Sequence, residues 1–353
     1  MKAHITVLAG DGIGTEVAAA GLQVLRQVAT RYGHQLSIDE QLIGGAAIDA
    51  CGHPLPPETI ASCLESDAVI LGAVGGPKWS DPNAAVRPEQ GLLALRSQMQ
   101  VFANLRPVRF IPALAAASPI KTERLQGVDL IVVRELTGGI YFGDKLRDPH
   151  SATDVCRYEA HEIERIVRVA ARLAVSRTGK LCSVDKANVL ETSRLWRDVT
   201  TRVIANEFPG IQLEHMLVDA AAMHLINRPT MFDVIVTENM FGDILTDEAS
   251  MLTGSMGMLS SASLGDSDRG LYEPIHGSAP DIAGRGIANP CGMIASIALL
   301  LRHSLHLDEE AQAVESAICA IVERGCRTAD IASSGEAALT TSQMTDEIIQ
   351  QLR

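Results

Sequence analysis

The chain has 353 residues, of which 46% are hydrophobic and 21% are charged, a balance typical of globular proteins and not of disordered or fibrous ones. Its 30 Lys and Arg residues are outnumbered by 43 Asp and Glu residues, and the resulting formal net charge of −13 argues against nucleic acid or an anionic membrane surface as a partner. A chain of this length is expected to form two domains.

The seven cysteines form no C-x-x-C pair, and their odd number argues against a disulfide framework. We therefore expect a reducing compartment, the cytoplasm. Residues Met1–Val7 lack the long apolar region of a signal peptide, and no run of about 18 apolar residues occurs in the chain. Neither export nor a membrane-spanning helix is expected.

Predicted strands and helices alternate along the whole chain. A short buried strand over Ile5–Ala9 precedes the turn Gly10–Gly14, and a helix follows from about Thr15 to Tyr32. Further buried strands are expected at residues 68–74, 130–133, 181–184 and 234–236, and further helices at residues 58–65, 159–176, 193–208 and 311–323. The pattern predicts an α/β fold. Because no linker rich in Pro, Gly or Ser divides the chain, the domains are expected to be interleaved and not sequential.

The glycine-rich turn Gly10-Asp11-Gly12-Ile13-Gly14 suggests a dinucleotide-binding motif at first sight. The fingerprint of a standard Rossmann domain is G-x-G-x-x-G, however, and here the third glycine comes one residue early, with Thr15 in its place. The spacing favours a tight turn, either beside an active site or with a purely structural role.

Two aspartates, Asp243 and Asp247, have the i, i+4 spacing that places both carboxylates on one face of a helix. Because like charges at this spacing repel, a bound Mg²⁺ or Mn²⁺ is one explanation of the pair, and a solvated acidic helix face is the other. The apolar residues around the pair and the strand expected just before it favour the cation site. Asp219, at the start of another apolar helical stretch, is a third candidate acid or a helix N-cap.

Several basic and proton-transferring side chains lie beside apolar sequence. Arg96, Arg106 and Arg134 are candidates for binding carboxylates in bidentate fashion, although an arginine in such a position, taken alone, is more often a surface residue. Lys186 and Tyr141 are candidates for proton transfer. The segment Glu273–Asn289 is dense in Gly, Pro and Ser and contains Asp281, a carboxylate that would accept hydrogen bonds from a ribose diol and repel a 2′-phosphate.

Taken together, these motifs resemble the β-decarboxylating dehydrogenases of the isocitrate/isopropylmalate dehydrogenase family, and the resemblance covers essentially the whole chain. The segments that carry it are Gly10–Gly14, Gly75–Trp79, Arg87–Leu93, Phe102–Pro107, Arg134–Asp144, Val184–Leu190, Thr237–Ser250 and Glu273–Asn289. The resemblance implies a fold that is not a standard Rossmann domain but has two open α/β domains. The first, which binds NAD, would combine residues 1–100 and 254–353, and the second, which forms a homodimer with shared active sites, would comprise residues 101–253.

The resemblance also implies a role for each site residue. Tyr141, Lys186 and Asp219 would be catalytic, and Asp219, Asp243 and Asp247 would hold Mg²⁺ or Mn²⁺, with Lys186 and Asp219 reaching in from the other subunit. NAD would contact Gly75, Gly76, His276, Gly277, Ser278, Ala279, Pro280, Asp281, Ile282 and Asn289. Arg96, Arg106, Arg134, Asp219, Glu89, Leu92, Leu93 and Val189 would bind substrate.

The implied reaction is the NAD-dependent oxidative decarboxylation of 3-isopropylmalate to 2-oxoisocaproate in leucine biosynthesis. The apolar pair Leu92 and Leu93, with Val189 of the partner, would suit an isopropyl group, although two adjacent leucines are equally compatible with core packing. Related substrates, namely D-malate, tartrate and homoisocitrate, are the alternatives within the family. Outside it, the rivals are a metal-dependent lyase or hydrolase without a nucleotide and a non-catalytic acidic binding protein.

Overall fold

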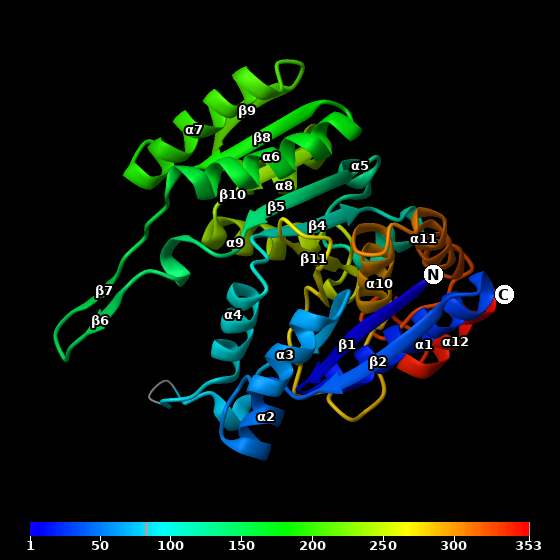
Figure 1. Ribbon diagram of the computed structural model, residues 1–353. Coiled ribbons are helices and arrows are strands. Elements are labelled where there is room, and N and C mark those ends of the chain that lie inside the picture. The colour runs from blue at the N-terminus through cyan, green and yellow to red at the C-terminus, as the bar shows by residue number, and fades with distance from the viewer. Residues whose placement is uncertain (82–83, 353) are drawn as a thin grey trace. The chain divides into compact units, whose positions relative to one another are not determined.

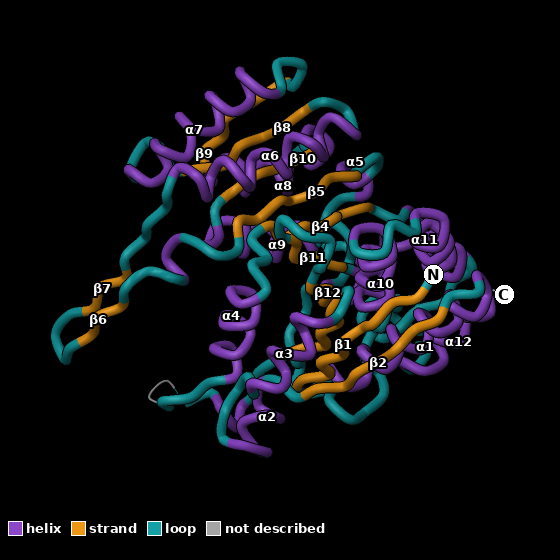
Figure 2. The backbone as a smooth tube through the Cα atoms, in the orientation of Figure 1, coloured by secondary structure: helices purple, strands orange, loops and turns teal. Residues whose placement is uncertain are grey.

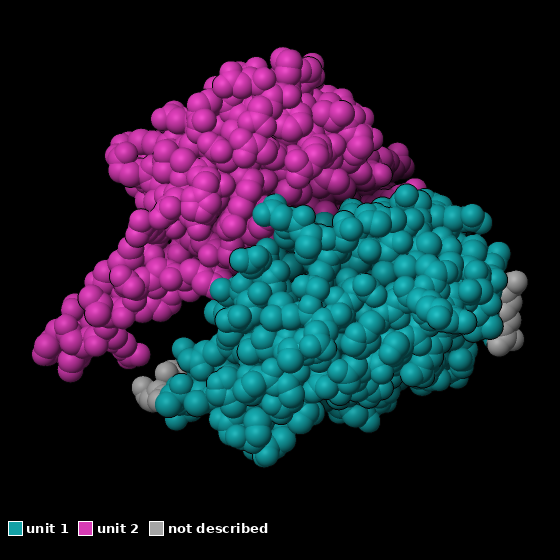
Figure 3. Space-filling model, in the orientation of Figure 1, with its two compact units in different colours: residues 1–101, 111–117, 253–353 teal, residues 102–110, 118–252 magenta. Residues whose placement is uncertain are grey.

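Figure 1 shows a computed structural model of the protein, which describes residues 1–81 and 84–352. The chain divides into two compact units (Figure 3): unit 1 comprises Met1–Val101, Ile111–Ala117 and Thr253–Arg353, and unit 2 comprises Phe102–Phe110 and Ser118–Leu252. The boundaries expected from the sequence lie next to these, except that residues 111–117 fall in unit 1. Residues 82–83 and 353, which belong to the expected first domain, lie outside the described residues.

The strands of unit 1, drawn in orange in Figure 2, are of mixed direction. In spatial order, they are β2 (Gln35–Gln41), β1 (Lys2–Gly10), β3 (Ala68–Ala73), β12 (Leu271–Pro274) and β11 (Ser260–Leu264). The first four run parallel, whereas β11 pairs antiparallel with β12. All residues of β3 are buried, as expected for a strand covered on both faces.

The helices of unit 1 bury one face each against these strands or against one another. They are α1 (Gly14–Tyr32), α2 (Gly44–Cys51), α3 (Pro57–Glu65), α4 (Pro88–Gln98), α10 (Cys291–His303), α11 (Asp308–Glu323) and α12 (Thr341–Gln351), with short 3₁₀ turns η1 (Pro77–Trp79), η2 (Pro112–Ala117) and η5 (Met256–Met258). Helix α1 ends at Gly33, whose φ of 72° is the left-handed conformation that closes a helix. Its Gly21 allows close packing on α10, because a Cβ there would lie 2.7 Å from the Met293 side chain.

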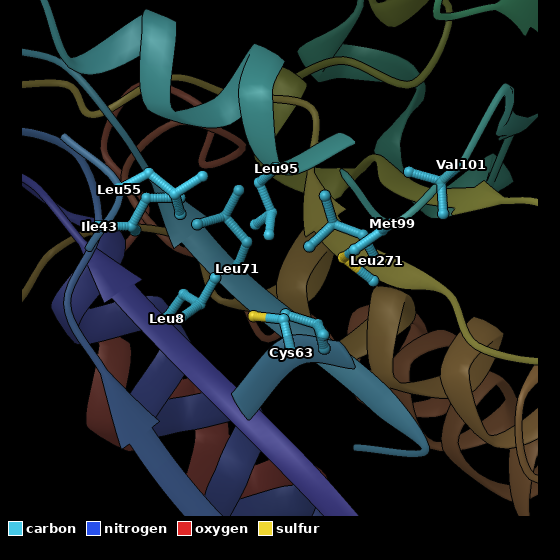
Figure 4. Close-up of a cluster of buried hydrophobic side chains, with 10 residues drawn as sticks. Leu8, Ile43, Leu55, Cys63, Leu71, Leu95, Met99, Val101 and Leu271 are labelled. Atoms are coloured by element: carbon cyan, nitrogen blue, oxygen red, sulfur yellow. The ribbon is translucent and has the colours of Figure 1, made fainter. Parts of the chain in front are cut away.

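A cluster of buried apolar side chains joins the sheet of unit 1 to α3 and α4 (Figure 4). Its members are Leu8, Ile43, Leu55, Cys63, Val69, Leu71, Leu95, Met99, Val101 and Leu271, and the half-buried Leu92 packs against it. Leu95 and Leu92 are three residues apart on α4, so one face of this helix is fixed to the core. Helix α4 also carries Glu89, Leu93 and Arg96, and of these Arg96 is buried.

The paired strands of unit 2 lie in the order β4 (Ala103–Arg109), β5 (Asp129–Glu135), β10 (Val234–Thr237), β8 (Lys180–Asp185) and β9 (Gln212–Leu217). Strands β5, β10, β8 and β9 are parallel, and β4 pairs antiparallel with β5. Because the carboxyl ends of parallel strands meet at one edge of a sheet, this topology brings Glu135, Asp185 and Glu238 to a common edge.

The helices of unit 2 are α5 (Thr122–Leu125), α6 (Ala160–Ser176), α7 (Glu191–Glu207), α8 (Val218–Asn227) and α9 (Asn239–Ser250), with 3₁₀ turns η3 (Gly139–Tyr141) and η4 (Pro229–Met231). Helix α6 begins with a capping box formed by Glu159 and Glu162, and its buried residues recur every three or four positions. A hairpin of β6 (Lys145–Arg147) and β7 (Ala152–Asp154) extends away from the sheet of unit 2 with all of its residues exposed (Figure 1).

The α/β class predicted from the sequence is confirmed, and the predicted strands and helices are present with ends shifted by a few residues. None of the described helices is long and apolar enough to cross a membrane. The seven cysteines all lie within the described residues, and none of them forms a disulfide bond.

Candidate active site

The two aspartates predicted to share a helical face both lie on α9, which begins directly after strand β10. The helix packs closely on β5, because Gly242 lies over the side chain of Arg134: a Cβ at this position would be 2.8 Å from the Arg134 Cβ. The glycine therefore allows Arg134 to lie beside Asp243. Asp243 and Asp247 are 37% and 59% exposed, so both carboxylates are accessible to a ligand.

Asp243 is surrounded by donors. Arg134 donates to its Oδ1, the phenol of Tyr141 donates to its Oδ2 at 2.9 Å, and Arg106 Nη2 lies 3.7 Å from its Oδ1. Burial raises the pKa of Asp243, but the charges of Arg134 and Arg106 and the bond from Tyr141 outweigh burial and lower it below its usual value. Asp243 is therefore held ionised.

The pKa of the neighbouring acid, Asp247, and that of the phenol of Tyr141 are raised instead. Burial raises the pKa of Asp247, and the charge of Asp243 adds to this, against a smaller lowering effect of Arg106, which lies 4.0 Å away. Burial also raises the pKa of Tyr141, as does its hydrogen bond to Asp243. The phenol of Tyr141 therefore stays protonated at neutral pH, as a proton donor requires.

The two arginines are oriented by residues that sequence reasoning did not single out. Arg134, whose side chain is 3% exposed, donates from Nε and Nη2 to Asn239 Oδ1 at 3.0 and 2.8 Å. Asn239 is itself fixed, because its Nδ2 donates to the carbonyls of Leu136 and Gly138. Arg106 donates to Asn104 and to Thr246 of α9. Asn239 follows directly after a strand end, and that position was the only signal in the sequence that pointed to it.

Lys186 and Asp219 form a second group in unit 2. Lys186 Nζ donates to Asp219 Oδ1 at 2.5 Å, and this bond lowers the pKa of the carboxyl. Asp219 is not the N-cap of α8, one of the two alternatives that the sequence left open, because that position belongs to Leu217 and Asp219 lies in the first turn. Among the described residues of a single chain, no three His, Cys, Asp or Glu side chains form a metal-binding group, so the structure does not bring Asp219 to Asp243 and Asp247.

The turn that carries Lys186 is held by Asp185, which is 1% exposed. Asp185 accepts from the Ala187 N–H at 2.9 Å and from two nitrogens of Arg197 at 2.9 and 2.8 Å. The same turn presents Val189, which is 61% exposed. The position of Lys186 is therefore set by an ion pair between the buried Asp185 of β8 and the half-buried Arg197 of α7.

Three carboxyl groups form a row at this edge of the sheet, because Glu135, Glu238 and Asp185 each follow a residue paired across β5, β10 and β8. Glu135 is 3.5 Å from Arg165, and Asp185 is paired with Arg197. Glu238 lies between two acids: burial first, and then the charges of Asp185 and Glu135, raise its pKa to about 7.

The substrate-binding candidates of unit 1 lie on α4. Arg96, one of the three arginines predicted to bind carboxylates, is on this helix, and its Nη2 donates to Glu273 Oε1 at 2.7 Å. The Arg96 Nε is buried without a hydrogen-bond partner, so one donor is not satisfied by the protein. Glu89 is exposed and lies next to Gly75, whereas Leu92 and Leu93 are half-buried. Leu92 contacts the core cluster, so the core-packing alternative holds for at least part of this side chain.

The predicted cofactor segment follows β12 as an irregular loop. Asp281 and Pro280 are exposed, Ile282 and Ala279 are partly exposed, and Gly277 is open to solvent. His276 is largely buried, which lowers its pKa, and its Nε2 has no hydrogen-bond partner. Ser278 and Asn289 are buried; the Asn289 amide donates to Asp330 at 3.0 Å and accepts from the Cys291 N–H. Gly75 and Gly76 lie between β3 and η1, where Gly75 donates to Asp11.

Two mixed α/β units, a carboxylate pair on a helix and buried arginines beside that pair are features expected of a dehydrogenase of hydroxy acids. The chain belongs to the isocitrate/isopropylmalate dehydrogenase family, whose model matches residues 4–348. It is 58% identical over 357 residues to the 3-isopropylmalate dehydrogenase of Anaeromyxobacter dehalogenans, with 100% of both chains covered. It is 56% identical to the protein of the same name from Bacillus licheniformis, with 99% of this chain and 95% of that one covered.

Solved structures show the same fold. The crystal structure of isocitrate dehydrogenase from Methylococcus capsulatus matches with a TM-score of 0.88 at 32% identity, with 99% of each chain covered. That of a β-decarboxylating dehydrogenase from Thermococcus kodakarensis matches with a TM-score of 0.80 at 32% identity, with 99% and 96% covered. The predicted family and the expectation of a fold distinct from a standard Rossmann domain are thus confirmed.

Proposed function

We propose that the protein oxidises and decarboxylates 3-isopropylmalate to 2-oxoisocaproate with NAD, in the biosynthesis of leucine, in the cytoplasm. The observation that carries this proposal is the full-length identity of 52–58% to relatives named 3-isopropylmalate dehydrogenase. The surroundings of Asp243 also support it, because they combine two buried arginines that would bind the carboxylates of the substrate with the protonated phenol of Tyr141.

The buried guanidinium groups support a dicarboxylic substrate. Arg106 and Arg134 are 8% and 3% exposed and lie beside the accessible face of α9, where their charges would attract a carboxylate of the substrate. Arg96, in unit 1, is a third buried arginine, and its Nε has no hydrogen-bond partner. In the proposal these arginines orient the substrate, so that the groups that transfer protons face the reacting carbon atoms.

The donors of α9 fit a hard divalent cation, because Mg²⁺ and Mn²⁺ prefer carboxylate oxygens. A carboxylate offers about four lone-pair positions, so the bonds from Arg134 and Tyr141 leave Asp243 able to bind a metal. In the proposal Asp243 and Asp247 hold Mg²⁺ or Mn²⁺ together with Asp219 of the partner subunit. When bound, the cation makes the substrate hydroxyl more acidic and stabilises negative charge on its oxygen, and NAD accepts the hydride.

Two groups of the protein move protons in this scheme. Lys186 takes the proton of the 2-hydroxyl in its neutral amine form, which it reaches by giving a proton to Asp219, the carboxylate with which its Nζ is paired. The turn that carries Lys186 is fixed by the Asp185–Arg197 pair, which holds the amine in place. Tyr141 delivers a proton to the carbon that CO₂ has left, because its raised pKa keeps the phenol protonated. Asp243 accepts the hydrogen bond that aims this phenol.

The proposed active unit is a homodimer with shared sites. The support is that Lys186 and Asp219 pair with each other in one chain and form no metal-binding group with Asp243 and Asp247 there. Each site would then combine α9 of one subunit with the Lys186 turn of the other, which would also place the exposed Val189 beside Leu92 and Leu93 of the partner. An isopropyl group suits such apolar walls, whereas the third carboxylate of isocitrate would be buried without a partner.

The experiment is an assay of NADH formation with 3-isopropylmalate, isocitrate, D-malate and tartrate, each with Mg²⁺ or Mn²⁺ and with chelator. We expect turnover with 3-isopropylmalate to exceed that with the other substrates by orders of magnitude. Equal use of isocitrate would refute the apolar pocket, and unchanged activity with chelator would refute the metal site. No NADH with any of the four substrates would refute the proposed function itself.

A further inference from the structure

The glycine-rich turn Gly10–Gly14 has a role that neither the proposed reaction nor the dinucleotide fingerprint explains. Asp11, which is 5% exposed, accepts from the N–H groups of Gly45, Ala46 and Gly75, all at 2.8 Å. Three backbone donors on one buried carboxylate fix the segment of Gly75 and the start of α2 against the turn. The turn is therefore a structural anchor for its surroundings.

The same turn also holds the start of the loop proposed to bind NAD. The Ile13 N–H donates to the Ser278 carbonyl at 2.8 Å. Gly12, with a φ of 57°, lies so close to this carbonyl that a Cβ would be 2.1 Å from the oxygen. Only glycine fits there, so the spacing of this motif reflects contact with the loop of Ser278 and not with a pyrophosphate.

The far end of that loop is held by Glu16, in the first turn of α1. Glu16 Oε1 accepts from the Gly284 N–H at 2.6 Å, and Glu16 Oε2 is buried with no hydrogen-bond partner. A carboxylate that leaves one buried oxygen unsatisfied is costly, so its placement is not explained by helix stability alone. Beyond Gly284, Thr341 binds the carbonyls of Gly286 and Ala288 through its N–H and its hydroxyl.

Asp281 and Ile282 lie between the two attachment points at Ser278 and Gly284. The Ile282 N–H donates to Ala279 and the Arg285 N–H to Ile282, which makes this stretch a compact turn with the exposed Asp281 at its surface. Without the Gly284 bond, the turn would be attached at its start and only again at Gly286. The orientation of Asp281 therefore depends on Glu16.

We propose that Glu16 is a positioning residue for the nicotinamide dinucleotide, which it serves by anchoring the Ser278–Gly284 turn through the Gly284 N–H. This inference rests on the proposed binding of NAD to that loop. It predicts that loss of the anchor weakens binding of the cofactor while leaving the substrate site of α9 intact.

The decisive variant is Glu16→Asp, which keeps an acid in the first turn of α1 but is one methylene too short to reach Gly284. We expect KM for NAD and the Kd for NADH, measured by fluorescence titration, to rise about tenfold, since a hydrogen bond to a charged group is lost. The kcat at saturating NAD and KM for 3-isopropylmalate should stay within about twofold. Glu16→Gln, whose neutral amide oxygen still accepts from Gly284, should raise KM for NAD clearly less than Glu16→Asp does.

A matched control is Glu58→Asp, at the exposed acid in the first turn of α3. If Glu16 acts only on the positive end of its helix, the two Asp variants should behave alike and neither should change KM for NAD. That outcome, or a Glu16→Asp effect spread equally over kcat and both KM values, would overturn the inference. Failure of the proposed function is distinct, because it would show as absent NADH formation by the wild-type protein.

Discussion

Glu238 provides the sharpest test of the electrostatics at the carboxyl edge of unit 2. It is 5% exposed and its pKa is raised from 4.5 to about 7, first by burial and then by Asp185 and Glu135. A pKa raised on folding means that the folded state binds the proton more tightly, so this group's contribution to stability is complete below about pH 4.5 and is lost as the pH rises through 7. Glu238→Gln cannot ionise and avoids that loss.

The expected magnitude follows from the shift. About 1.4 kcal/mol per pKa unit gives the variant a gain over wild type of about 2–3 kcal/mol between pH 5 and pH 8. Urea unfolding at fixed protein concentration measures this difference, with fluorescence of Trp196, which is 2% exposed in unit 2, as the probe.

The control is Glu214→Gln on β9, an exposed carboxyl whose replacement should give a stability difference that does not depend on pH. This expectation is refuted if the free energy of unfolding of Glu238→Gln minus that of wild type is constant within about 0.5 kcal/mol from pH 5 to pH 8, or decreases. The pKa of Glu238 would then not be raised by burial and by the neighbouring acids.

Three further predictions concern the site. Asp243→Asn should lower kcat by orders of magnitude with an unchanged circular dichroism spectrum, because a charge of the proposed metal site is lost; near-normal turnover would contradict this. Wild type should prefer NAD to NADP, and Asp281→Lys with Ile282→Tyr should shift kcat/KM towards NADP; equal use of both cofactors by wild type would show that Asp281 does not meet the ribose. Lys186→Ala and Tyr141→Phe proteins, each nearly inactive, should recover about a quarter of wild-type activity after subunit exchange, because half of the dimers are mixed and each has one intact site. No recovery despite demonstrated exchange would place both residues in one subunit's site.

Local periodicity predicted the parts of the fold that depend on neighbours in the chain. The spacing of Asp243 and Asp247 predicted a shared helical face, and α9 carries both residues directly after a buried strand. Helix α10 was not predicted, because nearly every position in it is buried and apolar and no polar face gives it a period. The antiparallel pairs β4–β5 and β11–β12 depend on partners that single-segment patterns do not reveal.

The residue types of the candidate site could be predicted from the sequence, but the hydrogen-bond partners that orient these residues could not. Arg134 was a candidate from its place near a strand end, whereas its partner Asn239 follows more than a hundred residues later. The same holds for Asp11 and Gly75 and for Glu16 and Gly284, whose hydrogen bonds join distant segments. Sequence patterns identify a group with useful chemistry, but which backbone donor meets it is set by tertiary packing.

The insertion of β12 beside β3 has a consequence for biosynthesis. Ile70 is paired with Tyr272, about 200 residues later, and α1 packs against α10 and α12 near the other end of the chain. Unit 2, whose residues end at Leu252, is complete in the nascent chain before β12 is made. Unit 1 is the first to be synthesised in part and the last to be completed. During translation its sheet therefore lacks β12, and the apolar edge of β3 stays uncovered until that strand has been made.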